Sequence, residues 1–347
     1  MPPMKMQRIV LAARPQGTPV LSDFRLETVE IAEPGEGELL LETVYLSLDP
    51  YMRGRMDDAK SYAEPVAIGA VMEGACVARV LRSNNPRFAV GDHVESRFGW
   101  VSHAISNGKG LRKLDPARAP VSTALGVLGM PGITAWAGLN LHGRPQAGET
   151  IVVSAATGAV GSLVGQLAKI RGLRVVGVAG GETKCRHAVE ELGFDACLDH
   201  HSGDASTLRK AIAAECPKGV DIYFENVGGK TLEAVLPLMN VHGRIPVCGM
   251  IAWYNAGGLG AGASDGPNLL PLAWRSILVK RLSVRGFIIT DHYEHFAEFE
   301  EEVSAHVRSG TVKYTESVSQ GLASAPQAFL DLLKGSNLGK QLVAVNA

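Results

Sequence analysis

Residues 151–171 constrain the fold of this chain more than any other stretch. They open with the β-branched run Ile151-Val152-Val153, which predicts a strand buried on both faces. A tight turn with Gly158 and Gly161 follows, and the apolar residues after it recur at the spacing of one helix face. Strand, glycine turn and helix together are typical of a site where a dinucleotide pyrophosphate binds the free amides of a helix N-terminus. An ordinary buried strand–helix unit has the same pattern, so this stretch alone leaves both interpretations open.

The glycines of the turn have separate roles in the dinucleotide interpretation. Gly158 would let the backbone approach the phosphates, and Gly161 would let the helix pack closely against the strand. The first position of the usual G-x-G-x-x-G pattern is Ala156, so the match is partial.

The loop after the second predicted strand indicates which dinucleotide is bound. This strand, residues 174–179, ends at Gly180-Gly181, where an NAD-binding unit would carry an acid for the ribose hydroxyls. No acid stands there, and Lys184 follows, with Arg186 just beyond. A lysine can form a charge-assisted hydrogen bond with a 2′-phosphate, worth about 1.5–3 kcal/mol, whereas an acid would repel it. The pattern favours NADP(H) over NAD(H), although a solvated lysine at a helix start is also common.

Composition excludes several classes of protein. The 347 residues suffice for two domains, and 34 Lys and Arg against 35 Asp and Glu favour neither nucleic acid nor a membrane as a partner. The five cysteines lack C-x-x-C spacing, which argues against a structural zinc site and a disulfide framework. Residues 119–141 carry no charge, but their prolines, glycines and polar side chains suit a globular interior. The N-terminus lacks the apolar core of a signal peptide, so we expect a cytoplasmic protein.

Two domains are expected from the order of the elements. Up to about residue 120 the chain is β-rich, with strands expected at 25–30, 38–45, 66–71 and 74–80. Farther along, helices expected at 182–192, 204–215, 231–239 and 293–308 alternate with strands near 196–198, 219–225, 243–249 and 282–287. This alternation predicts an α/β fold with a doubly wound parallel sheet. A helix at 325–333 and a strand at 341–345 are expected to return to the β-rich part.

Five motifs carry a resemblance to the zinc-independent medium-chain dehydrogenases and reductases. They are LSLDPYMRGRM at 46–56, GMPGITA at 129–135, AATGAVG at 155–161, ENVGG at 225–229 and NLGK at 337–340. The subgroup they resemble comprises NADPH-dependent 2-alkenal, prostaglandin and leukotriene reductases. The resemblance spans essentially the whole chain. It implies a GroES-like β-barrel catalytic domain (1–127 and 311–347), a Rossmann domain (128–310), a homodimer, and NADPH-dependent reduction of the C=C bond of α,β-unsaturated carbonyls.

The zinc ligands of other superfamily members have no counterpart in these motifs. Zinc enzymes carry a Gly-His-Glu segment and an earlier Cys-His pair. The comparable stretches here are VMEG at 71–74 and DPYM at 49–52, which offer no nitrogen or sulfur ligand. We therefore expect no metal, which disfavours a zinc-dependent alcohol dehydrogenase.

Two tyrosines are candidate catalytic residues by the same resemblance. Tyr254 would place a hydroxyl near the substrate and stabilise the enolate, and Tyr51 would form a pocket wall and a second donor. Each can instead be an aromatic packed at the domain cleft, and water or a ribose hydroxyl can deliver the proton. His200 replaces a phosphate-contacting tyrosine of mammalian relatives, so its contribution is expected to vary with pH. The resemblance implies an NADPH site formed by Gly158, Ala159, Val160, Gly161, Lys184, His200, Asn226, Cys248, Gly249, Tyr254, Phe287, Ile288, Ile289 and Asn337.

Alternatives to the enone reductase remain open. A ζ-crystallin-type quinone reductase would share the fold, although Tyr51 and Tyr254 in their motifs favour the enone. A redox sensor that binds NADPH without turnover would carry the same cofactor motifs. Arg53 and Arg55 either steer an acidic substrate or form salt bridges. The pocket is expected to depend on loops around Tyr62, Trp100 and residues 256–266.

Overall fold

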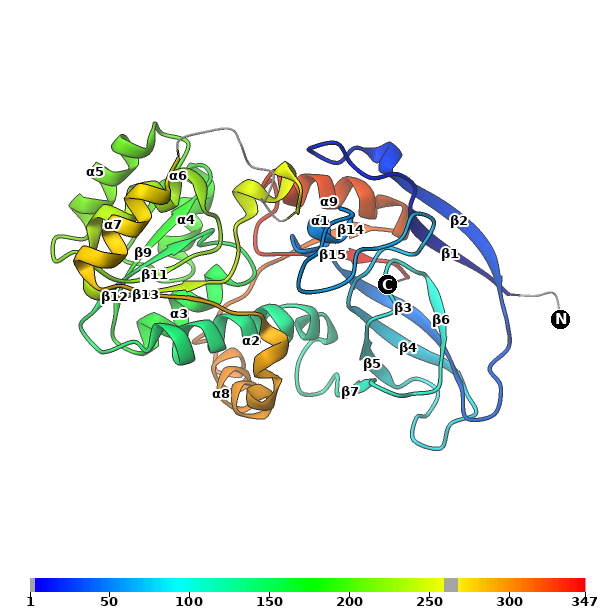
Figure 1. Cartoon of the computed structure of the whole chain (residues 1–347). Coiled ribbons are helices and arrows are strands. Elements are labelled where there is room, and N and C mark those ends of the chain that lie inside the picture. Colours follow the sequence, from blue (N-terminus) through cyan, green and yellow to red (C-terminus); the bar gives the residue numbers. More distant parts are fainter. Residues whose placement is uncertain (1–3, 259–267, 347) are drawn as a thin grey trace. The chain divides into compact units, whose positions relative to one another are not determined.

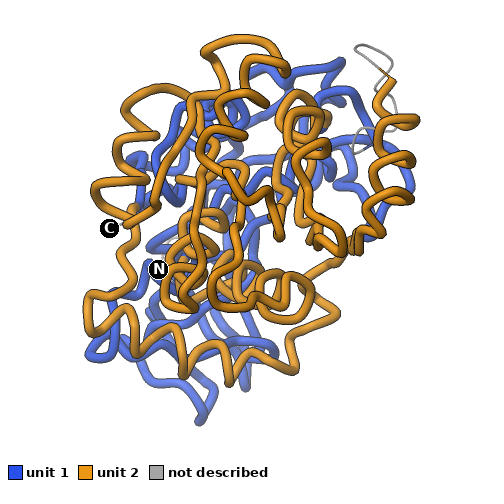
Figure 2. Tube along the Cα trace, turned by 90° about the vertical axis from the view of Figure 1, so that its left-hand side faces the viewer, with its two compact units in different colours: residues 1–126, 254–262, 316–347 blue, residues 127–253, 263–315 orange. Residues whose placement is uncertain are grey.

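The computed structural model describes residues 4–258 and 268–346 (Figure 1). The chain divides into two compact units (Figure 2). The first comprises residues 1–126, 254–262 and 316–347, and the second comprises residues 127–253 and 263–315. A stretch from the middle of the sequence, beginning at Tyr254, therefore belongs to the first unit. Most of the glycine-rich loop 256–266 lies outside the described residues.

A six-stranded sheet forms the centre of the second unit, in the order β10-β9-β8-β11-β12-β13. Its strands are β8 (Thr150–Ser154), β9 (Arg174–Ala179), β10 (Ala196–Asp199), β11 (Val220–Phe224), β12 (Met239–Val247) and β13 (Ser283–Gly286). All neighbouring strands pair in parallel, which confirms the predicted doubly wound α/β fold. The strand order reverses between β8 and β11. In sheets of this kind, ligands bind at the carboxyl ends of the strands beside such a reversal.

Consecutive strands of this sheet are connected by the helices α3 (Gly161–Ile170), α4 (Glu182–Glu190), α5 (Ala205–Glu215), α6 (Gly229–Val235) and α7 (Leu270–Lys280). Helix α2 (Met130–Ala137) precedes the sheet in the sequence, and α8 (Phe296–Arg308) follows it. The start of α5 follows from its N-cap, because the Asp204 carboxylate accepts a bond from the Thr207 amide at 2.8 Å. Helix α7 was not predicted from the sequence. None of the helices in the described parts of the chain is both long and apolar enough to span a bilayer.

The first unit contains a seven-stranded sheet and a separate two-stranded sheet. The strands are β1 (Met4–Leu11), β2 (Phe24–Ile31), β3 (Leu39–Ser47), β4 (Cys76–Ser83), β5 (His93–Ser96), β6 (His103–Ser106), β7 (Arg112–Leu114), β14 (Glu316–Gln320) and β15 (Lys340–Ala344). Strand β15, near the end of the chain, pairs antiparallel with β3. The strand predicted at 66–71 is wrong. Gly69 has φ +83°, which interrupts an extended backbone, and only Val71 forms an isolated bridge, with Val10.

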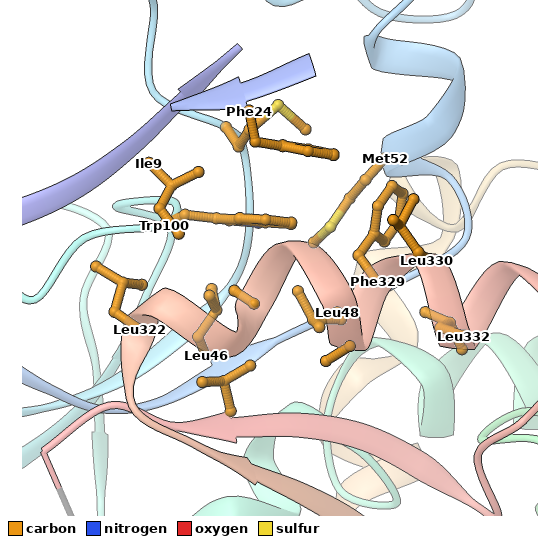
Figure 3. Close-up of a cluster of buried hydrophobic side chains, with 14 of the residues drawn as sticks. Ile9, Phe24, Leu46, Leu48, Met52, Trp100, Leu322, Phe329, Leu330 and Leu332 are labelled. Carbon is orange, nitrogen blue, oxygen red and sulfur yellow. The ribbon is translucent and has the colours of Figure 1, made fainter. Parts of the chain in front are cut away.

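An aromatic cluster in the core of the first unit anchors the DPYM motif (Figure 3). The rings of Phe24 and Trp100 stack at 5.6 Å, and Phe329 of α9 (Ala325–Leu333) meets Trp100 edge-on at 5.8 Å. Met52, the first residue of the short helix α1 (Met52–Arg55), is buried in the same cluster, and Tyr51 packs against it. Trp100 itself is fully buried in this cluster.

Candidate functional site

The turn from β8 to α3 is closed by a contact that only glycine permits. Ala155 has φ +49°, and its carbonyl accepts a hydrogen bond from the Gly158 amide at 2.9 Å. A Cβ added at Gly161 would lie 2.3 Å from the same carbonyl oxygen, whereas one at Gly158 would lie 3.2 Å from it. Gly161 therefore cannot carry a side chain without moving the turn. This geometry supports the role assigned to Gly161 in close helix–strand packing.

The departure from the glycine pattern at Ala156 is accommodated by the neighbouring strand. Ala156 is fully buried, and a Cβ added at Gly177 of β9 would lie 2.8 Å from the Ala156 methyl. The missing side chain of Gly177 thus leaves room for the methyl group of Ala156. The turn keeps its close packing with alanine at the first position of the pattern.

Cationic groups gather beyond the carboxyl end of β9. Lys184 is half-buried on the first turn of α4, and burial lowers the pKa of its ammonium group. A Cβ at Gly180 would lie 3.1 Å from His200 Nε2. Burial chiefly lowers the pKa of His200, and the nearby charges of His201 and Lys230 lower it further. The neighbouring cations thus disfavour the charged form of His200, and an anion bound beside this ring would favour it.

Lys230 was missed by the sequence analysis. It lies in the first turn of α6, and its ammonium donates to the carbonyls of His200 and, at 2.8 Å, Gly203. Nothing in the sequence around Lys230 indicates this position, because the contact depends on how α6 packs beside the loop after β10. Lys230 both holds the His200 loop and adds positive charge to it.

An acid from the neighbouring strand also lies in this region. Asp199 ends β10, and its Oδ1 accepts bonds from the amides of Gly181 at 2.8 Å and His201 at 2.9 Å. These two backbone bonds lower the pKa of Asp199. The loop Gly180-Gly181 after β9 contains no acid. Asp199, from the neighbouring strand, instead fixes the backbone of this loop through the Gly181 amide.

A buried carboxyl group organises the carboxyl end of β11. Glu225 Oε1 accepts bonds from the Val227 amide at 2.7 Å, the Gly228 amide at 2.9 Å and the Ser154 hydroxyl at 3.1 Å. Burial raises the pKa of Glu225. The side-chain amide of Asn226 donates to the Ser154 carbonyl at 2.7 Å, which ties the ends of β8 and β11 together.

The end of β12 is joined to the same turn. The amides of Cys248 and Gly249 both donate to the carbonyl of Glu225, at 2.8 and 3.1 Å. Burial and the nearby Glu225 raise the pKa of the Cys248 thiol to about 12, so this thiol is a poor nucleophile. Glu225, Asn226, Cys248 and Gly249 therefore lie with the turn at 158–161 at the carboxyl ends of β8, β11 and β12. Phe287, Ile288 and Ile289 follow the end of the adjacent strand β13.

The remaining candidates lie in the first unit. Burial, reinforced by Asp49 and Glu73, raises the pKa of Tyr51, so its hydroxyl stays protonated. The Arg55 guanidinium lies 4.5 Å from the ring centre of Tyr62 and pairs with Glu73 at 3.2 Å. Of the two roles left open for Arg55, the structure shows the salt bridge.

Tyr254 and Asn337 also belong to the first unit. Tyr254 lies half-buried in the 3₁₀ helix η5 (Ile251–Ala256). The side-chain amide of Asn337 donates to the carbonyl of Gly339 at 2.8 Å, within its own turn. Lys340 directly follows Gly339, and its buried ammonium group pairs with the Asp49 carboxylate at 3.0 Å. This ion pair connects the NLGK and DPYM motifs.

A parallel sheet with a glycine turn at its reversal and a cationic loop after its second strand defines a dinucleotide-binding α/β protein. Comparison with known families is consistent with this class. Residues 7–114 match the family described as the N-terminal domain of oxidoreductase, and residues 159–306 match the family described as zinc-binding dehydrogenase. Within residues 4–258 and 268–346, no three His, Cys, Asp or Glu side chains are grouped to hold a metal ion.

Relatives of known name match along nearly the whole chain. The chain is 53% identical over 340 residues to the NADPH-dependent curcumin reductase of Escherichia coli (strain K12), covering 98% of this chain and 96% of the relative. It is 40% identical to the 2-alkenal reductase (NADP(+)-dependent) of Nicotiana tabacum, covering 98% and 97%. The crystal structure of CurA in complex with NADPH from Vibrio vulnificus matches with a TM-score of 0.92 and 48% identity, covering 98% and 99%.

The chain therefore belongs to the medium-chain dehydrogenase/reductase family and is an oxidoreductase with GroES-like and Rossmann-type parts. The family predicted from the five motifs is confirmed, as is the likeness to 2-alkenal and prostaglandin reductases.

Proposed function

We propose that this protein uses NADPH to reduce the C=C bond of α,β-unsaturated ketones and aldehydes. The observation that carries this proposal is the 53% identity, over nearly the full length of both chains, to a NADPH-dependent curcumin reductase. The relatives named 2-alkenal reductase and prostaglandin reductase 1, at 40% identity each, support the same reaction class.

The second unit suits the cofactor. Gly158 would let the backbone approach a pyrophosphate at the turn that Gly161 closes. Lys184 and Lys230 would provide charge for a 2′-phosphate, and the His200 ring can donate a hydrogen bond to it. When bound, NADPH supplies the hydride. We assign its binding to Gly158, Ala159, Val160, Gly161, Lys184, His200, Asn226, Cys248, Gly249, Tyr254, Phe287, Ile288, Ile289 and Asn337.

The residues of this chain have a limited chemical task. As the β-carbon of the enone is reduced, negative charge builds up on the carbonyl oxygen. A hydroxyl donor placed at that oxygen stabilises the resulting enolate. We assign this donor role to Tyr254, with Tyr51 as pocket wall and second donor. A tyrosine whose pKa is raised, as that of Tyr51 is, keeps its proton and so remains a donor. The proton for the α-carbon can come from a tyrosine hydroxyl, from water or from a ribose hydroxyl of the cofactor.

Turnover with matched acceptors tests the proposal. Purified protein is mixed with NADPH and, in separate reactions, with a small enone, an enal and a benzoquinone. We expect NADPH oxidation with the first two and a saturated carbonyl product identified by NMR. Turnover with the quinone alone would instead support a quinone reductase. A stable NADPH complex that none of the three oxidises would support a sensor.

We also propose that the protein forms a homodimer through the β13 edge of its sheet. All four residues of β13 are exposed, and among the described strands β13 pairs with β12 alone. A strand edge that is unpaired in this way can pair with another copy. On the adjacent helix α7, Trp274 and Leu278 are 62% and 78% exposed. Leu278→Asp should shift the species seen by analytical ultracentrifugation toward the monomer. Val90→Asp, at a 67% exposed site in the first unit, is the control. A wild-type monomer would contradict the assembly.

A further inference from the structure

An arginine in the DPYMRGR motif is buried without contributing to the proposed chemistry. The Arg53 side chain is 1% exposed and pairs with Asp57 at 2.6 Å, one helical turn later. Its second terminal nitrogen donates to the carbonyl of Gly17 at 2.8 Å. Arg53 therefore does not steer an acidic substrate, and its buried charge is compensated by Asp57.

The second carboxylate oxygen of Asp57 has a partner far along the sequence. It accepts a hydrogen bond from the Gly258 amide at 2.9 Å. Gly257 and Gly258 both have positive φ, +82° and +54°, so the backbone turns at this contact. A Cβ added at Gly17 would lie 4.0 Å from the Asn255 carbonyl, which places the Arg53-bound loop beside the same segment.

Residues 254–258 are thus held at their far end by the charged side chain of Asp57. At the near end, the amides of Ile251 and Ala252 donate to the carbonyls of Asn226 and Val227 at 3.3 and 3.0 Å. Tyr254 lies between the two anchors. Catalytic groups lose much of their effect when displaced by about 1 Å, so the precision of such anchors affects turnover.

We propose that Asp57, oriented by Arg53, is a positioning residue for Tyr254: it fixes the segment 254–258 through the Gly258 amide. This inference rests on the proposed role of Tyr254. The motif at 46–56 and its flanking residue Asp57 then have a positioning role in addition to the donor role proposed for Tyr51. A charged acceptor is suited to the task because a charge-assisted bond is stronger and shorter than a neutral one.

Hydrogen exchange and kinetics on matched variants test the inference. Asp57→Ala removes the acceptor, Asp57→Asn keeps the shape and one acceptor oxygen, and Asp58→Ala changes the exposed neighbouring acid as a control. For Asp57→Ala we expect faster amide exchange in peptides covering 251–258, kcat lower by about ten-fold and NADPH affinity within about two-fold. Asp57→Asn should fall between wild type and Asp57→Ala, and Asp58→Ala should match wild type. Thermal unfolding shows which variants remain folded.

A double variant that combines Asp57→Ala with Tyr254→Phe tests whether Asp57 acts through Tyr254 or has a purely structural role. If Asp57 acts through Tyr254, Asp57→Ala should lower kcat by less than about two-fold in the Tyr254→Phe background. An undiminished effect there, unchanged exchange in 251–258, or unchanged kcat in the single variant would overturn the inference. A wild-type protein without enone turnover would overturn the proposed function instead, and the exchange data would still decide whether Asp57 holds the segment.

Discussion

The methyl group of Ala156 occupies space that a side chain at Gly177 would need, because a Cβ at Gly177 would lie 2.8 Å away. The two residues belong to the β8–α3 turn and to the middle of β9, and both are buried; Ala156 is 0% exposed. The pair explains why a glycine pattern that is incomplete in sequence still forms a close-packed turn. Substitutions at these two positions can therefore test how closely the turn packs against β9.

Gly177→Ala should destabilise the protein by about 1–3 kcal/mol, because the new methyl group overpacks against Ala156, Cys197 and Phe194. Adding Ala156→Gly should recover part of the loss, since it removes one of the three contacts. Urea unfolding of the single and double variants measures the coupling. Strictly additive effects would contradict the pairing.

Lys184→Ala should raise the Michaelis constant for NADPH by about ten-fold or more and leave that for NADH nearly unchanged. The reason is the loss of a charge-assisted bond worth about 1.5–3 kcal/mol to the 2′-phosphate. Arg186→Ala, an exposed change on the same helix, is the control and should have a smaller effect. Equal effects of Lys184→Ala on both cofactors would rule out the phosphate role.

Tyr254→Phe should lower kcat by about 10²-fold, the size of effect seen when one donor to a developing oxyanion is removed. NADPH affinity should change far less, because the hydroxyl is assigned to the substrate. Stopped-flow measurement of hydride transfer, with fluorescence titration of NADPH, separates the two quantities. Unchanged hydride transfer would remove this hydroxyl from the mechanism.

Glu225→Gln should make stability less sensitive to pH. Burial raises the pKa of Glu225, so the folded protein keeps this proton at pH values where the unfolded chain loses it. Its favourable contribution is complete below the unfolded pKa and is lost as the pH rises through the folded pKa. The stability of Glu225→Gln relative to wild type should therefore increase as the pH rises above the ordinary pKa of a glutamic acid, about 4.3, in urea unfolding experiments. A relative stability that falls over this range would show that the carboxylate is the favoured form.

Lys340→Met should destabilise the protein by about 3–5 kcal/mol, because it leaves the buried Asp49 without its cation. Combining it with Asp49→Asn should reduce the loss, since the uncompensated charge is then absent. Lys334→Met, at an exposed site on the same segment, is the control. Equal unfolding free energies for Lys340→Met and wild type would show that the ion pair makes no net contribution.

Local patterns in the sequence determined the class of fold and the family. β-Branched runs, glycine spacing and helical periodicity are properties of neighbouring residues, so they predicted the parallel sheet and its turn. The same reasoning failed at residues 66–71, where the positive φ of Gly69 ends an apolar run that resembles a strand. Helix α7 was missed, and its exposed Trp274 and Leu278 show why: its apolar side chains are not confined to one buried face.

Only the tertiary structure decided which distant residues meet. Lys230 reaches the His200 loop, Gly177 makes room for Ala156, and Asp57 binds the Gly258 amide. It also placed Tyr254 with the first unit, although the sequence prediction assigned this residue to the nucleotide-binding domain. Such contacts depend on strand register and on how helices pack over the sheet. Strand register and helix packing depend on residues that are far apart in the sequence, so a pattern of neighbouring residues cannot predict them.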